Sequence, residues 1–142
     1  MLRGKLIHPE ILEALGRAGH GSKVLIADGN YPFATASGPR ARLVFLNLGP
    51  GLLSVTDVLG VLAHAIPIEA ASVMMPQGET PPIFAEFSKL LPAEVQLQPL
   101  DRFAFYSASS DESVALVIAT AEERIYANIL LTIGVVHPQA TI

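Results

Sequence analysis

The chain has 142 residues, the length of one ordinary domain, and its 9 basic and 13 acidic residues give a net charge of −4. It contains no cysteine, which excludes disulfides, thiolate catalysis and cysteine-ligated zinc and is compatible with a cytoplasmic protein. No basic cluster is present that would neutralise several phosphates, so we expect no nucleic-acid partner.

The hydrophobic content is high for a water-soluble domain. Hydrophobic residues make up 51% of the chain and charged residues 15%, against about 25% charged residues in an average domain. No apolar run approaches the roughly 20 residues of a membrane-spanning helix, and Leu6-Ile7 leads into His8-Pro9-Glu10 with no signal-peptide core. We therefore expect no membrane insertion, and a homo-oligomer that buries apolar surface between copies.

The first third of the chain predicts one helix and two strands. Pro9 suits a first helical position, apolar residues follow at helical spacing, and Gly19 suits the end of the helix. The apolar run 24–27 predicts a buried strand that ends at Asp28, and a second strand is predicted at 42–46.

The rest of the chain continues the alternation. Ser54 to Asp57 resembles a capping box before a helix with an apolar face, and Pro81-Pro82 predicts the start of a third helix. Strands are predicted at 70–75, 95–97, 114–119 and 128–136, with a bulge or close approach at Gly134, and a short helix at 101–106. The alternation predicts a single α/β domain over 1–142, a three-layer fold whose mostly parallel or mixed sheet is flanked by helices, with 137–142 a flexible tail.

Three polar groups are candidates for chemistry. His20 lies between two glycines, and histidine has an ordinary pKa of about 6.5, which suits proton transfer, while Asp28 ends a buried strand. Tyr126 and Asn128 are two residues apart at the start of the last strand and suit a vicinal diol. Arg102 would donate to hydroxyl oxygens beside aromatic rings.

Each group alone also has a purely structural interpretation. His20 would then be a loop residue, Asp28 a turn cap, Asn128 a turn-favouring residue at a strand start, and Arg102 part of a local pair with Asp101. The four histidines show no metal-binding spacing, and the glycines at 49–51 lack the spacing of a phosphate or dinucleotide loop. We therefore predict no metal and no cofactor.

Several motifs occur along the chain in a fixed order: Gly19-His20-Gly21, Ala27-Asp28-Gly29-Asn30-Tyr31-Pro32, Val73-Met74-Met75-Pro76, Arg102-Phe103-Ala104-Phe105-Tyr106, and Tyr126-Ala127-Asn128-Ile129 through Gly134-Val135-Val136. Taken together, they resemble the L-fucose mutarotase / D-ribose pyranase family over about residues 2–136. The resemblance implies that His20 is the proton donor and that Asp28, Arg102, Tyr126 and Asn128 bind a free monosaccharide. It also implies a homo-oligomer, commonly a decamer of two pentameric rings, with sites near subunit boundaries. Ring opening also needs a base, for which Asp28 and Tyr126 are the candidates; the alternative for Asp28 is that it only orients His20 or holds a hydroxyl.

Arg102 and the aromatic residue before Pro32 resemble the fucose-type branch, which implies anomer exchange of L-fucose, its methyl group lying against Tyr31 or Phe33. Two features depart from that branch: Ser22 stands where an acidic residue is common, and the loop before Arg102 is shorter. D-ribose pyranase is the alternative enzyme, and a non-catalytic sugar-binding accessory of a transport operon is the alternative of another class.

Overall fold

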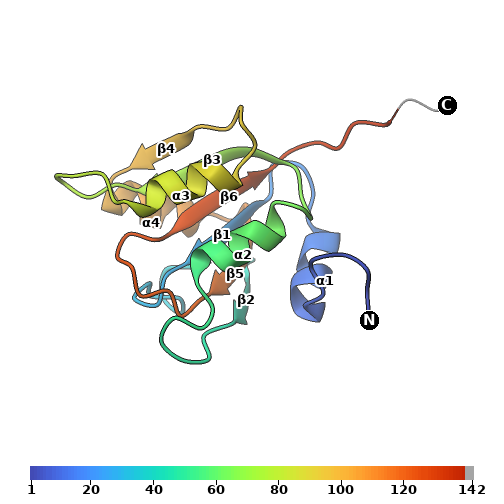
Figure 1. The fold of residues 1–142 in the computed structure, drawn as a ribbon, viewed down its shortest axis with the longest axis horizontal. Coiled ribbons are helices and arrows are strands. Elements are labelled where there is room, and N and C mark those ends of the chain that lie inside the picture. Colours follow the sequence, from blue (N-terminus) through green and yellow to red (C-terminus); the bar gives the residue numbers. More distant parts are fainter. Residues whose placement is uncertain (140–142) are drawn as a thin grey trace.

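The predicted alternation of helices and strands is confirmed in the computed structural model, which describes residues 1–139 (Figure 1). Residues 140–142, the end of the segment predicted to be a flexible tail, lie outside the described residues. The elements are α1 (Pro9–Arg17), β1 (Lys23–Ala27), β2 (Arg42–Phe45), α2 (Val55–Leu62), β3 (Ile68–Met74), α3 (Ile83–Leu90), β4 (Leu97–Leu100), α4 (Arg102–Ser109), β5 (Val114–Ala119) and β6 (Ile129–Ile133).

Side-chain caps fix where three of the helices begin. The His8 ring accepts a hydrogen bond at Nδ1 from the Ile11 N–H (3.3 Å) before α1, with Pro9 at the first helical position. The predicted capping box of α2 is present, since Ser54 and Asp57 satisfy each other's backbone N–H groups. Asp101 accepts from the Ala104 N–H (2.9 Å), so it caps α4 and does not form the local pair with Arg102.

The six strands of residues 1–139 form one mixed sheet in the order β2-β5-β1-β6-β3-β4. β6 runs antiparallel to both of its neighbours, while the β2-β5, β5-β1 and β3-β4 pairs are parallel. The ends of the other five strands and the beginning of β6 therefore meet at one edge, which we call the carboxyl edge. The starts of those five strands and the end of β6 form the opposite, amino edge.

Helices cover both faces of the sheet, as the three-layer prediction requires (Figure 1). On one face, Val24 and Ile26 of β1 pack in a core that includes residues of α1, α2 and α3. On the other face, Leu25 of β1 packs with Phe105 of α4 in a second core. The last four of the five residues of β1 are fully buried, and each large apolar side chain contributes about 1.5–3 kcal/mol by leaving water.

The ends of two predicted strands were misplaced by three residues, while the bounds of the other strands differ by at most two. β6 ends at Ile133, not 136, and the next N–H, of Gly134, donates to the Pro67 carbonyl before β3 begins (2.9 Å). The predicted close approach at Gly134 is confirmed, since a Cβ there would lie 3.2 Å from the Glu69 Cβ. β4 lies at Leu97–Leu100 and not at 95–97, because the Val95 N–H closes a turn onto the Pro92 carbonyl (3.0 Å).

Within residues 1–139, no helix combines the length and the apolar character needed to cross a membrane.

Candidate functional site

A small cavity of about 170 Å³ opens at the carboxyl edge of the sheet and brings together four of the five predicted site residues. They come from three separate turns or loops, since Asp28 follows β1, Arg102 begins α4 after β4, and Tyr126 and Asn128 both precede β6. Ligands of open α/β sheets bind at this edge, because the loops that follow parallel strands converge there. The lining residues are Asp28, Asn30, Tyr31, Met74, Arg102, Tyr106, Ile125, Tyr126 and Asn128.

Asp28 is 3% exposed and is held in one orientation by its neighbours. Its Oδ1 accepts from the Asn30 N–H (3.0 Å), and its Oδ2 accepts from the Ala127 N–H and from Asn128 Nδ2 (both 3.2 Å). In return, the Asp28 N–H donates to Asn128 Oδ1 at 2.7 Å. Because a carboxylate has about four acceptor positions, these three bonds leave it capacity for a ligand hydroxyl.

Burial raises the pKa of the Asp28 carboxyl above its ordinary value. Hydrogen bonds from three backbone N–H groups and from the Asn128 side chain oppose the rise without cancelling it. A carboxylate with a raised pKa holds a proton more tightly than an ordinary one, so it is a better general base.

Tyr126 has an unusual backbone conformation, with φ at +56°, in the left-handed region that residues other than glycine rarely adopt. Such a conformation persists where the surrounding structure enforces it, and it is frequent at functional sites. The half-buried ring lines the cavity, while Asn128 is buried and directed at Asp28. The sequence predicted that Tyr126 and Asn128 lie at the start of the last strand, and this was wrong. β6 begins only at Ile129, so both residues precede the strand.

Aromatic rings support Arg102 and form one wall of the cavity. The Arg102 guanidinium lies 5.7 Å from the centre of the Tyr106 ring one turn further along α4, and the Tyr106 and Tyr31 rings are 5.6 Å apart. The Tyr31 hydroxyl donates to the Ala36 carbonyl at 2.7 Å, and burial raises its pKa to about 12. Tyr31 therefore presents its ring to the cavity, while Phe33 packs behind it at 6.0 Å.

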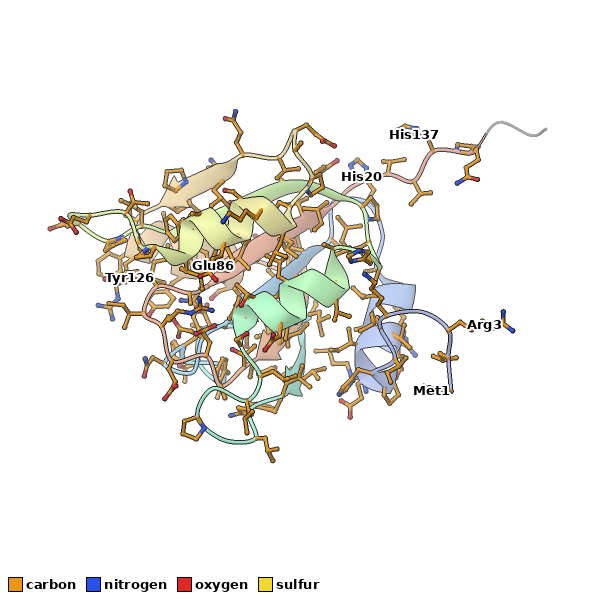
Figure 2. The ribbon with its side chains drawn as sticks, in the orientation of Figure 1. Met1, Arg3, His20, Glu86, Tyr126 and His137 are labelled. Atoms are coloured by element: carbon orange, nitrogen blue, oxygen red, sulfur yellow. The ribbon has the colours of Figure 1, made fainter. Side chains whose placement is uncertain are left out.

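His20, the fifth predicted site residue, lies away from the cavity. It precedes β1 and sits at the amino edge, exposed, with Nε2 3.1 Å from both carboxylate oxygens of Glu69. Figure 2 shows His20 and Tyr126 on opposite sides of the molecule. The five residues of β1 alone separate His20 from Asp28 by about 15 Å, so the structure does not bring these two predicted catalytic residues together within one chain.

Two residues that the sequence reasoning missed lie beside the cavity. Glu122 is 4% exposed, and its carboxylate accepts from Arg124 Nε (2.9 Å) and from the Val55 N–H at the start of α2 (3.1 Å). In the sequence, Glu122 and Arg124 belong to a charged segment that resembles a solvated loop. A usable signal was the position of Glu122 three residues after the end of the buried strand β5, where a buried carboxylate requires a partner.

Within residues 1–139, no three histidine, aspartate or glutamate side chains gather where they would ligate a metal ion.

Curated relatives cover almost the whole chain. A fucose mutarotase from Mus musculus is 31% identical over 140 residues, covering 92% of this chain and 90% of the relative. A D-ribose pyranase from Variovorax paradoxus is 31% identical over 141 residues, covering 95% and 98%. With these relatives and an α/β sheet that carries its cavity at the carboxyl edge, the protein is an enzyme of the carbohydrate isomerase class, of the mutarotase type.

The model of the RbsD / FucU transport protein family matches residues 1–136, and the chain belongs to that family. Among solved structures, that of Bacillus subtilis RbsD complexed with D-ribose superposes with a TM-score of 0.82 at 25% identity, covering 96% of this chain and all of the other. The family membership inferred from the sequence motifs is confirmed.

Proposed function

We propose that the protein catalyses the exchange of the ring forms of a free monosaccharide, with L-fucose anomers as its preferred substrate. The observation that carries the proposal is the cavity at the carboxyl edge, where the Asp28 carboxylate, the Asn128 amide and the Tyr126 phenol converge with Arg102. Carboxylate, amide, phenol and guanidinium groups are the partners that bind sugar hydroxyls. The relatives named fucose mutarotase and D-ribose pyranase support the same chemistry.

The reaction requires a base and an acid on opposite sides of the sugar's anomeric centre. The base, which we assign to Asp28, removes the O1 proton, and the acid protonates O5 as the C1–O5 bond breaks. The open aldehyde rotates about C1–C2 and closes on its other face, with the protons returned. Arg102, Tyr126 and Asn128 hold the remaining hydroxyls during the rotation, so that the ring recloses before the sugar leaves.

We assign the acid to His20 of a neighbouring copy. The cavity at the carboxyl edge contains no histidine among its described lining residues, and His20 is exposed at the amino edge beside Glu69. An assembly in which the amino edge of one subunit meets the carboxyl edge of the next would complete every site in a closed ring. The large exposed apolar side chains support burial between copies, and we propose the decamer of two pentameric rings. They include Phe45, Leu48, Leu52, Phe103, Ile125 and Val136.

Complementation between inactive variants tests this assignment. His20→Ala and Asp28→Asn are each expected to lose accelerated exchange, because each removes one member of the acid–base pair. When the two are unfolded together and reassembled, about one quarter of the sites combine an intact Asp28 with an intact neighbouring His20, so about one quarter of the wild-type activity should return. A mixture of His20→Ala with His20→Gln is the matched control and should stay inactive.

An inactive mixture of His20→Ala and Asp28→Asn would contradict a shared site. Sedimentation of the wild type at micromolar concentration gives an independent check, since a species near the 15.1 kDa monomer would refute the assembly.

The preference for L-fucose is supported by the apolar part of the cavity. The Tyr31 and Tyr106 rings, Met74 and Ile125 offer surface to the methyl group of a 6-deoxy sugar. Burying one methyl group contributes about 0.8 kcal/mol or somewhat more, and discrimination by such a contact is roughly three- to tenfold. D-ribose has no such group, so we expect L-fucose to be turned over faster by that factor.

Saturation-transfer NMR on L-fucose and D-ribose with added protein separates the alternatives. Faster exchange of L-fucose than of D-ribose supports the proposal, and equal or faster exchange of D-ribose favours a pyranase. Binding of either sugar without faster exchange would instead indicate a sugar-binding accessory. The cytoplasmic location stays part of the proposal, because a chain without cysteine suits a reducing compartment.

A further inference from the structure

A charged pair lies just outside the sugar cavity, in the connection between β5 and β6. The Glu122 carboxylate is bound by both ends of the Arg124 guanidinium, with Nε to Oε1 and Nη2 to Oε2 both at 2.9 Å. It also accepts from the N–H groups of Val55 and Arg124, each at 3.1 Å. Neither Glu122 nor Arg124 is among the described residues that line the cavity.

The pair fastens this connection to two helices. Arg124 Nη1 donates to the carboxylate of Glu86 on α3, and Nη2 reaches Thr56 Oγ1 on α2 at 3.2 Å. Figure 2 shows Glu86 on the same side of the molecule as Tyr126. Burial alone would raise the pKa of Glu122, but the hydrogen bonds and the charge of Arg124, with the backbone N–H groups, hold its pKa below the ordinary value. Glu122 is therefore an anion at neutral pH.

The same connection is bonded to the turn that carries Asp28. The Gly29 N–H donates to the Glu122 carbonyl at 2.9 Å, and a Cβ at Gly29 would lie 3.1 Å from that oxygen, so a larger residue there would make a tight contact. The Glu122 N–H donates to Thr120 Oγ1 (3.2 Å), whose hydroxyl donates to the Ala27 carbonyl (2.7 Å). The Glu122 backbone is therefore hydrogen-bonded to the residue after Asp28 and, through Thr120, to the residue before it.

Arg124, the second member of the pair, is close to Tyr126 along the chain. Arg124 is two residues before Tyr126, whose backbone at φ +56° is held by contacts rather than by intrinsic preference. The next N–H, of Ala127, donates to Asp28 Oδ2. Glu122 and Arg124 thus lie between the two parts of the site and touch both through the backbone.

We infer that Glu122 and Arg124 are positioning residues, which hold the β5–β6 connection so that Tyr126 and Asp28 face the sugar together. The inference rests on the proposed function for its effect on catalysis. Its structural part, the fixed placement of the connection, can be measured without any sugar. Lysine would not replace Arg124, because an ammonium group cannot bind a carboxylate through two parallel N–H groups in one plane.

Amide hydrogen exchange tests the structural part. Arg124→Gln should speed exchange of the Gly29 and Ala127 amides by about tenfold or more, because the bonds of both amides depend on the placement of the connection. Arg42→Gln is the matched control: Arg42 also binds two carboxylates, Glu13 and Glu10, but from the edge strand β2 and against α1. It should leave both amides unchanged, and unchanged exchange in Arg124→Gln would refute the inference whatever the sugar chemistry.

A double-mutant cycle with Tyr126→Phe tests the catalytic part. If Arg124 acts by placing Tyr126, loss of the phenol hydroxyl should slow L-fucose exchange about tenfold in the wild type and less than about threefold in Arg124→Gln. A merely structural role would give the same slowing in both backgrounds. In the Arg42→Gln control background, Tyr126→Phe should slow exchange by the wild-type factor. If Arg124→Gln does not fold, Arg124→Lys is used, with the same expectation.

The outcomes separate the two proposals. A wild type that accelerates no sugar exchange refutes the proposed function, and the amide exchange of Gly29 and Ala127 then still decides on the pair. Equal Tyr126→Phe factors in the two backgrounds refute the positioning role and leave the function intact.

Discussion

Replacing Asn128 by leucine removes both side-chain bonds to Asp28 while nearly conserving volume. The Asp28 N–H loses its acceptor at 2.7 Å, and Asp28 Oδ2 loses a donor at 3.2 Å. Because Asp28 is 3% exposed, water does not freely replace these partners. A buried N–H left without a partner costs about 1–3 kcal/mol, so we expect about 2 kcal/mol of destabilisation and a Tm lower by roughly 6 °C.

The same substitution should change how activity depends on pH. The pKa of Asp28 is already raised by burial, and the Asn128 hydrogen bond is one of the contacts that lower it. Without that bond the pKa rises further, so the anion needed as base is lost at a higher pH as the solution is acidified. We therefore expect the acid limb of the exchange rate to move to higher pH, in addition to a roughly tenfold slower rate at neutral pH.

Exchange of L-fucose measured by saturation-transfer NMR across the acid range, together with a thermal melt, checks both effects. Gln98→Leu, an amide replaced at an exposed position of β4, is the matched control and should change stability by less than about 0.5 kcal/mol and leave the pH profile unchanged. An Asn128→Leu enzyme with the wild-type acid limb would refute the role of Asp28 as the base.

Three further substitutions separate binding from stability. Tyr31→Phe should lower the free energy of unfolding by about 1 kcal/mol and leave L-fucose exchange within about twofold, since its hydroxyl bonds the Ala36 carbonyl and not the cavity; a strong loss of exchange would contradict this. Thr120→Val should lower the free energy of unfolding, measured with urea, by about 1–3 kcal/mol, because the Glu122 N–H loses its buried acceptor; unchanged stability would argue against that bond. Arg102→Ala should raise the KM for L-fucose about tenfold with a Tm within roughly 2 °C of the wild type, because Arg102 is an exposed first residue of α4; an unchanged KM would remove Arg102 from the site.

The sequence predicted those elements whose residues decide their own conformation. The strand at 114–119 and the capping box at Ser54 were found where the apolar run and the spacing of Ser and Asp placed them. β4 was misplaced because two of its four residues, Gln98 and Pro99, are exposed, and its position depends on pairing with β3. Pairing between distant segments leaves little trace in a short strand.

The sequence predicted four of the residues that line the cavity, but not how they come together. Asp28, Arg102, Tyr126 and Asn128 lie together because the sheet order places β1, β4 and β6 with their relevant ends at one edge. His20 is close to Asp28 in sequence, yet a strand converts eight residues of separation into the distance between two edges of the sheet. Sequence proximity was therefore misleading for the one residue whose partner we place on another subunit.

The position of β6 in the sheet bears on the order in which the molecule can form. β1 with β5 and β2 makes one half of the sheet, β3 with β4 makes the other, and β6 lies between them although it comes last in the chain. A nascent chain that has emerged from the ribosome only as far as residue 128 can collapse into two half-sheets, each with an unpaired inner edge. When β6 pairs with β1 and β3, it joins the two half-sheets and at the same time brings Asn128 into hydrogen-bonding distance of Asp28. Completion of folding and acquisition of the sugar cavity are then a single event, and incomplete chains should be recognised by chaperones through their open strand edges while still unable to bind sugar.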